Sequence, residues 1–159
     1  IPNPIGYYGQ SKFDGEEVVK GKAMIVRISY PYGSAGSEKP DFVQRFKSLL
    51  TLNKPLTMIT DAAMTPTFID DIAGGLSYLM KNFKPEIFHL VGAKSYTPFE
   101  VGTIIAKKYH LPESLIQKTT FAAYSTNKSP RPQYSIIMSS KNTFQNMRIF
   151  EDGVHAIQE

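Results

Sequence analysis

The sequence contains no cysteine, which excludes disulfide bonds and thiolate metal sites. Its three histidines, His89, His110 and His155, stand far apart and outside any H-E-x-x-H motif, so we expect no metal site. Long apolar runs are also missing, because none reaches the roughly 18 residues that a membrane-spanning helix requires. We therefore expect a cytoplasmic protein without a membrane partner.

Two further features are missing. The chain opens Ile1-Pro2-Asn3-Pro4-Ile5, without an initiating methionine or the basic start of a signal peptide, which predicts a piece of a longer protein. It also lacks the Gly-rich strand–turn–helix that binds the pyrophosphate of a dinucleotide. The loop Gly33-Ser34-Ala35-Gly36 follows a predicted strand, but its glycine spacing does not match that turn.

The charges that are present form no cluster. The chain carries 18 basic and 14 acidic residues, a net charge of +4, and only Lys107 and Lys108 are adjacent basic residues. A nucleic-acid groove requires a clustered basic face with interleaved aromatic residues, so we expect no nucleic-acid partner. With 159 residues, 42% of them hydrophobic, the chain is long enough for one globular core.

The apolar pattern predicts alternating helices and strands. Predicted helices cover residues 8–20 (ended by Gly21), 41–52 (capped by Asp41), 70–82 (capped by Asp70), 97–109 (opened by Thr97-Pro98), 113–117 and 140–147. Predicted strands cover 23–29, which we expect to be buried, 56–59, 67–69 and 87–91, while the rest of 111–132 is irregular. In the helix from Asp70, we expect Ile72, Ala73, Leu76 and Leu79 to face inward. The alternation indicates an α/β fold in a single unit, 1–159.

One spacing carries chemistry. Tyr8 and Lys12 stand four residues apart and therefore share a helix face. A free tyrosine has a pKa of about 10, and a nearby cation stabilises the phenolate. Such a phenol can exchange the proton that accompanies hydride transfer to a carbonyl group.

The same spacing occurs at Tyr124 and Lys128, so spacing alone identifies nothing. Pro130 and Pro132 exclude a long helix around Tyr124. The first pair instead opens a predicted helix that is followed closely by a strand, which is the rigid support that a catalytic pair requires. We therefore favour Tyr8 and Lys12 as the catalytic pair and read the second pair as accidental.

Several short segments of the chain occur in the order and at the spacing of a known enzyme family. They are Asn3-Pro4, Tyr8-Gly9-x-Ser11-Lys12, Gly15-Glu16, Arg27-x-Ser29-Tyr30-x-Tyr32-Gly33, Asp61-x-x-Met64-Thr65-Pro66-Thr67, Asp70-Asp71-Ile72-Ala73, Arg131-Pro132-x-x-Ser135 and Ser139-Ser140-Lys141. Together they cover most of the chain, and they resemble the extended short-chain dehydrogenases/reductases. Within these enzymes the sequence is most similar to the dTDP-4-dehydrorhamnose reductase group.

The resemblance implies a role for each matching residue. Tyr8 would give a proton to the carbonyl oxygen of a 4-keto sugar nucleotide, and Lys12 would hold the ribose hydroxyls of NADP or NAD. Pro31 would lie at the nicotinamide side of the cofactor site. Tyr30, which stands where the family usually has Trp, Thr65 and Arg131 would contact the nucleotide-sugar substrate. Arg131 also has a physical reason, because a guanidinium pairs well with a diphosphate. The sequence is equally consistent with Arg131 being an ordinary solvated arginine in a loop.

The resemblance also implies the architecture. The chain would be the C-terminal part of a Rossmann-like extended fold, with the N-terminal cofactor-binding half absent. Residues 1–54 would end the Rossmann-like part, and 55–159 would form mainly the substrate-binding subdomain, with a strand at 86–91 returning to the sheet. We expect the isolated chain to be inactive, and either to self-associate or to be the protected part of a degraded longer protein. We expect the protein to be a homo-oligomer. Met64 and Ile137-Met138 depart from the family pattern, which leaves the sugar open.

Three alternatives remain. The family includes the non-catalytic regulatory subunit of methionine adenosyltransferase, so a regulatory protein of the same fold is the first. A nucleotide-sugar epimerase or dehydratase, which shares the Tyr and Lys, is the second. An α/β interaction module without enzymatic ancestry is the third.

Overall fold

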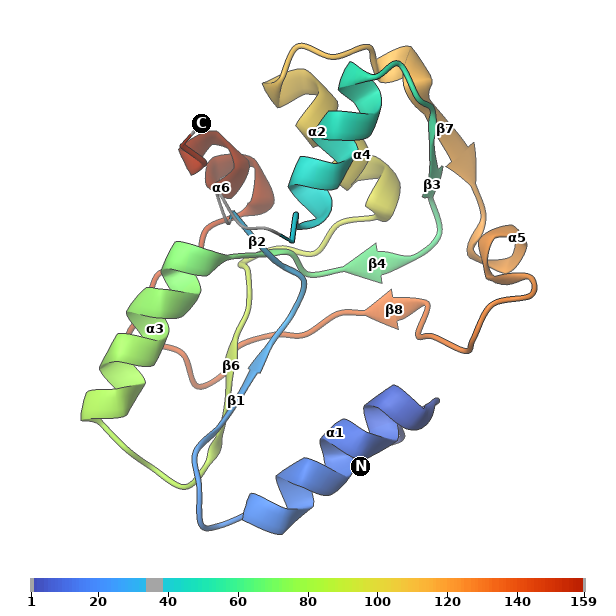
Figure 1. Cartoon of the computed structure of the whole chain (residues 1–159). Coiled ribbons are helices and arrows are strands. Elements are labelled where there is room, and N and C mark those ends of the chain that lie inside the picture. The colour runs from blue at the N-terminus through green and yellow to red at the C-terminus, as the bar shows by residue number, and fades with distance from the viewer. Residues whose placement is uncertain (1, 34–38, 159) are drawn as a thin grey trace.

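The protein is described from a computed structural model, which places residues 2–33 and 39–158 (Figure 1). Its helices are α1 (Tyr7–Val19), α2 (Phe42–Thr51), α3 (Ile69–Lys81), α4 (Pro98–Lys108), α5 (Phe121–Ser125) and α6 (Phe150–Ala156), with a 3-10 turn at Glu113–Leu115. Its strands are β1 (Ile25–Ile28), β2 (Pro31–Tyr32), β3 (Leu56–Ile59), β4 (Ala63–Met64), β5 (Thr67–Phe68), β6 (Ile87–Leu90), β7 (Ile116–Thr119) and β8 (Tyr134–Ser135).

The described strands form four parallel pairs, β1–β6, β2–β5, β3–β7 and β4–β8. Parallel neighbours need a crossover connection, and here helices supply much of it, as the α/β prediction requires. In the β1–β6 pair, Ile25 lies opposite Ile87 and Ile28 lies opposite Leu90. The predicted α/β class is therefore confirmed.

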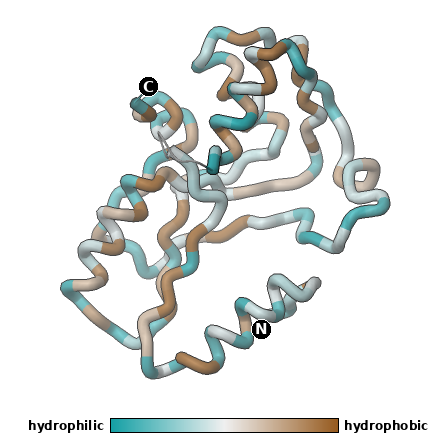
Figure 2. The backbone as a smooth tube through the Cα atoms, in the orientation of Figure 1, coloured by the Kyte–Doolittle hydropathy of each residue, from teal (hydrophilic) through white to brown (hydrophobic). Residues whose placement is uncertain are grey.

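Among the described residues, three apolar clusters hold the pairs in place, one of them around β3 and β7. Val26, Phe88 and Leu90 of β1 and β6 pack with Leu79 of α3 and with Met147. A second, aromatic cluster joins β2, β5 and α6. The centre of the Tyr32 ring lies 4.9 Å from that of Phe150 and 5.7 Å from that of Phe68. Figure 2 shows hydrophobic colour along β1 and β6, whereas α1 is mostly pale or hydrophilic.

Local sequence signals set two helix starts as predicted. The Asp41 carboxylate accepts hydrogen bonds from the backbone of Val43 and Gln44, and the Thr97 hydroxyl accepts one from Glu100. In both cases the third helical residue bonds back to the cap, which completes a capping box. Gly21 has a φ of +72°, the left-handed backbone that a glycine adopts freely, just after α1.

Other local predictions were wrong. Asp70 does not cap α3, because β5 leads into the helix without a loop and Phe68 is the N-cap. Leu76 and Ala73 are exposed, while Gly75 takes the inward position against Leu90. Strand β1 is only half-buried, and Ile28 at its end is 46% exposed.

The C-terminal part also differs from prediction. No helix forms over 140–147, where the Asn142 side chain accepts a hydrogen bond from the Gln145 backbone and so replaces a helical turn. Strand β7 and helices α5 and α6 were missed. Gly153 in the middle of α6 lowers the helix propensity, but it lets the helix lie directly on Tyr32.

Among the helices in residues 2–33 and 39–158, none has the length and apolar character needed to cross a bilayer.

Candidate active site

The predicted catalytic pair lies on the first turns of α1. The Lys12 ammonium is 5.5 Å from the centre of the Tyr8 ring, so the two side chains do share one helix face. Tyr8 is 79% exposed, and α1 buries none of its residues. The phenol and the ammonium are therefore together and open to an incoming molecule.

An ion pair ties helix α1 to β1, and the residue before the helix lies close to Pro130. The Arg27 guanidinium on β1 donates two hydrogen bonds to the Glu16 carboxylate, the longer one 2.8 Å. This pairing lowers the pKa of Glu16 and raises that of Arg27. At the other end of α1, a Cβ on Gly6 would lie 3.6 Å from the Pro130 carbonyl oxygen. The Tyr8 end of α1 thus borders the segment that carries Arg131.

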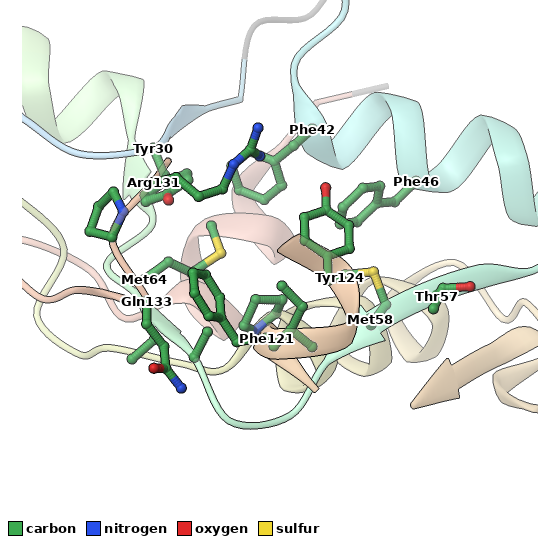
Figure 3. Close-up of a pocket in the computed structure, with 15 residues that line it drawn as sticks. Tyr30, Phe42, Phe46, Thr57, Met58, Met64, Phe121, Tyr124, Arg131 and Gln133 are labelled. Atoms are coloured by element: carbon green, nitrogen blue, oxygen red, sulfur yellow. The ribbon is translucent and has the colours of Figure 1, made fainter. Parts of the chain in front are cut away.

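Two of the predicted substrate residues, Tyr30 and Arg131, line the same pocket (Figure 3). The cavity measures about 230 Å³, and most of its wall is apolar. Its other lining residues include Phe42, Phe46, Met58, Met64, Phe121, Tyr124 and Gln133. Figure 3 shows the Arg131 side chain reaching toward Phe42 from the rim. The Arg131 guanidinium thus lies at the rim of a pocket lined by aromatic side chains.

Tyr124 belongs to this pocket, which sequence reasoning missed. The Lys128 ammonium lies 3.3 Å from the centre of its ring, and the Arg131 guanidinium carbon lies 5.9 Å from it. Helix α5 ends at Ser125, and Asn127 has a φ of +60°, so Tyr124 and Lys128 do not sit on one helical face. Their spacing builds a cation–ring stack at the pocket wall.

The other pocket aromatics had weak signals in the sequence. Phe42 and Phe46 recur at helical spacing and could be recognised only as core residues. Phe121 opens α5, and Asp61 accepts a hydrogen bond from its backbone. This contact joins residues 60 positions apart, so no local pattern announces it.

The remaining predicted site residues lie outside this pocket's lining. Pro31 is exposed in β2 and pairs with Thr67. Thr65 is buried, its hydroxyl lies 2.8 Å from the Ser95 hydroxyl, and it accepts a hydrogen bond from the Ile137 backbone. The Thr65 side chain therefore ties the 136–138 segment to β4 instead of facing the cavity.

Comparisons with known proteins identify the family of this chain. Residues 1–157 match the family model described as the RmlD substrate binding domain. The spore coat polysaccharide biosynthesis protein SpsK of Bacillus subtilis is 30% identical over 138 residues, which are 85% of this chain and 47% of SpsK. The methionine adenosyltransferase 2 subunit beta of Rattus norvegicus is 30% identical over 129 residues, which are 76% of this chain and 39% of that protein. The chain thus spans about half the length, or less, of the curated relatives it matches.

A solved structure is similar over nearly the whole chain. It is the dTDP-4-dehydrorhamnose reductase of Bacillus anthracis in complex with NADP, with a TM-score of 0.87 and 26% identity. The match covers 98% of this chain and 56% of the reductase.

Proposed function

Since the chain belongs to the RmlD substrate-binding domain family, we propose that it forms the substrate side of a nucleotide-sugar reductase. In this proposal the intact protein uses NADPH or NADH to reduce the 4-keto group of a sugar nucleotide such as dTDP-4-dehydrorhamnose. A cytoplasmic location and assembly as a homo-oligomer belong to the same proposal.

The observation that carries the proposal is the meeting of Arg131 with aromatic rings in one pocket. Nucleobases stack on aromatic side chains, and this stacking is tolerant of base identity. A guanidinium forms paired, charge-assisted hydrogen bonds with phosphate oxygens. The pocket therefore has the two features that a nucleoside diphosphate needs, an apolar wall and a forked cation at its rim.

Tyr8 and Lys12 provide the chemistry from α1, the start of which lies close to Pro130, the neighbour of Arg131. The chemistry that a reduced nicotinamide supplies when bound is a hydride for the carbonyl carbon. Tyr8 gives its phenolic proton to the carbonyl oxygen, which completes the alcohol. The Lys12 ammonium stabilises the phenolate that Tyr8 leaves behind and offers donors to ribose hydroxyls.

The described residues fit only one end of that cofactor. Tyr8 and Lys12 present a phenol and an ammonium on an open helix face, which suits the ribose next to the nicotinamide. Pro31, exposed after β1, is placed as a further cofactor contact in this proposal. The sequence has no Gly-rich turn for the pyrophosphate. In this proposal Thr65 contributes to the substrate site indirectly, because its hydroxyl accepts a hydrogen bond from the Ile137 backbone and so holds that segment.

The test measures reduced-cofactor consumption by the intact protein with 4-keto sugar nucleotides. We expect Tyr8→Phe to lose at least about a hundredfold in turnover, the scale of general acid catalysis. Tyr7→Phe is the matched control, because Tyr7 is the adjacent residue, 97% exposed, and should leave turnover unchanged. Equal rates for the two variants would refute the role of Tyr8, and turnover without net cofactor consumption would indicate an epimerase or a dehydratase.

A second candidate is a regulatory subunit without catalysis. It is favoured by the 30% identity to methionine adenosyltransferase 2 subunit beta, equal to that of SpsK. In that case the intact protein would consume no reduced cofactor with any 4-keto sugar nucleotide, and Tyr8→Phe would change nothing. Co-purification with a methionine adenosyltransferase would then distinguish the two functions.

A further inference from the structure

Tyr30 has an unusual backbone for a bulky residue. Its φ is +42°, in the left-handed region that favours glycine. A non-glycine residue there costs on the order of 1–3 kcal/mol and persists only when surrounding contacts impose it. The side chain of this residue lines the candidate substrate pocket.

One residue, Thr67, holds the peptide groups on both sides of Tyr30. The Thr67 hydroxyl donates a 2.6 Å hydrogen bond to the carbonyl of Ser29, and the Thr67 backbone N–H donates a 3.2 Å bond to the carbonyl of Tyr30. Thr67 is fully buried. Since both flanking carbonyls accept hydrogen bonds from the same buried residue, the Tyr30 backbone is held in its strained conformation.

The Thr67 hydroxyl also bridges two strands where they separate. The β1–β6 ladder ends at Ile28 opposite Leu90. Just beyond it, the hydroxyl donates to Ser29 and accepts a 3.2 Å hydrogen bond from the Gly92 backbone. It thus satisfies one carbonyl and one N–H that the ladder leaves open.

The Gly92 backbone makes this bridge possible. A Cβ at Gly92 would lie 2.1 Å from the carbonyl oxygen of Pro66, the residue before Thr67. Only glycine permits such a close approach of two backbones. The 66–67 segment is therefore seated on Gly92, which brings the Thr67 hydroxyl between the two strand ends.

We propose that Thr67 is a positioning residue for the substrate site, which sets the Tyr30 side chain in the pocket through these three hydrogen bonds. This inference rests on the proposed function for its effect on catalysis, but its effect on Tyr30 is independent of any reaction. Thr67 touches neither the pocket nor the Tyr8–Lys12 pair in this proposal, so it acts through Tyr30.

The first test follows residue 30 directly. The chain contains no tryptophan, so Tyr30→Trp adds one indole whose quenching by acrylamide can be measured as a difference from the parent chain. In this background we expect Thr67→Val to raise the quenching constant toward that of free indole. Thr67→Ser keeps the hydroxyl, so its quenching constant should stay near that of Tyr30→Trp alone. The same is expected of Thr103→Val, which removes a hydroxyl on α4. Equal quenching in Thr67→Val and Thr103→Val, with folding confirmed by circular dichroism, would overturn the proposal.

The second test uses kinetics of the intact protein. Displacing a substrate-positioning group by about 1 Å can cost roughly a hundredfold in rate, so we expect Thr67→Val to lower kcat/KM by ten- to a hundredfold. Thr67→Ser should recover most of it, whereas a purely structural role would lower the melting temperature and leave kcat/KM at low temperature unchanged. If the parent protein reduces no sugar nucleotide, the proposed function fails, and the quenching comparison still decides whether Thr67 positions residue 30.

Discussion

The Glu16 carboxylate on α1 is paired with the Arg27 guanidinium on β1 through two hydrogen bonds. Because α1 buries no residue of its own, this pair is a principal anchor of the helix that carries Tyr8 and Lys12. We expect Arg27→Gln to lower the free energy of local opening of α1 by about 1 kcal/mol, the upper range for partly exposed pairs. Hydrogen exchange of the amides in Tyr7–Val19 measures this change.

Lys20→Gln is the control for the Arg27 prediction. It removes the Lys20–Glu17 pair, which is exposed and joins neighbouring positions at the end of the same helix. Such a pair does not tie α1 to a strand, so exchange in the first turns of α1 should stay unchanged. Similar exchange in the two variants would show that the Arg27 pair does not anchor α1.

The same pair predicts a dependence on acid. Hydrogen bonding to Arg27 lowers the pKa of Glu16 below its ordinary value in the folded state. The stabilisation is therefore fully present above the unfolded pKa of about 4.3 and is lost as the pH falls through the lower folded pKa. Glu16→Gln should be less stable than the parent at pH 7, and the difference should narrow below about pH 4. Urea unfolding of both proteins at the two pH values tests this, and a constant difference would contradict it.

Sequence reasoning succeeded where local chemistry decides the structure. Asp41 and Thr97 announce helix starts because a cap acts within three residues of its own position. The strand 56–59 was placed at its observed bounds. The prediction failed at α6, because Gly153 reads as a helix breaker unless its long-range contact with Tyr32 is known.

The residues of the candidate site likewise include some that the sequence predicts and some that depend on long-range contacts. Tyr30 and Arg131 were named from motifs, and the structure places both in one pocket. Tyr124 was set aside because its surroundings are rich in polar residues and proline, although its ring forms part of the pocket wall. Its placement depends on the fold of 120–133 against β4, including the Gln133 side-chain bond to the Asp61 carbonyl. No spacing within the segment encodes such a contact.

Arg131 should be more than a positive charge. If it holds a diphosphate with its forked N–H groups, Arg131→Lys keeps the charge but loses the paired geometry. We expect this variant to raise the KM for the sugar nucleotide by roughly tenfold, the equivalent of about one charge-assisted hydrogen bond, with little change in kcat. Steady-state kinetics of the intact protein measures both constants.

Arg45→Lys provides the comparison for Arg131. Arg45 lies on α2, next to the pocket residue Phe46, but its own side chain does not line the pocket. This variant should leave the KM unchanged. An Arg131→Lys variant that behaves like Arg45→Lys would assign Arg131 to the solvated surface.

The contact between Gly153 and Tyr32 predicts a strong and specific loss of stability. A Cβ at Gly153 would lie 1.9 Å from the Tyr32 hydroxyl oxygen and 3.3 Å from the Phe68 Cβ, both in the aromatic core. Gly153→Ala should therefore destabilise the protein by about 1–3 kcal/mol, the cost of overpacking. Gly15→Ala is the opposite control, because nothing lies within 4 Å of its Cβ position and alanine favours a helix by roughly 0.5–1 kcal/mol over glycine.

Combining Gly153→Ala with Tyr32→Phe relieves the closest part of the clash and leaves the ring carbon Cζ, 2.9 Å from the Cβ position. The phenylalanine removes the hydroxyl oxygen nearest the new methyl group, and the hydrogen bond it gives up, from Tyr32 to the Phe150 carbonyl, is long at 3.4 Å. In urea unfolding, the double variant should be more stable than the sum of the two single changes predicts, by roughly 0.5–3 kcal/mol. Additive effects would mean that α6 shifts away from β2 to accept the methyl group, and that the close packing of α6 on Tyr32 is not enforced by the core.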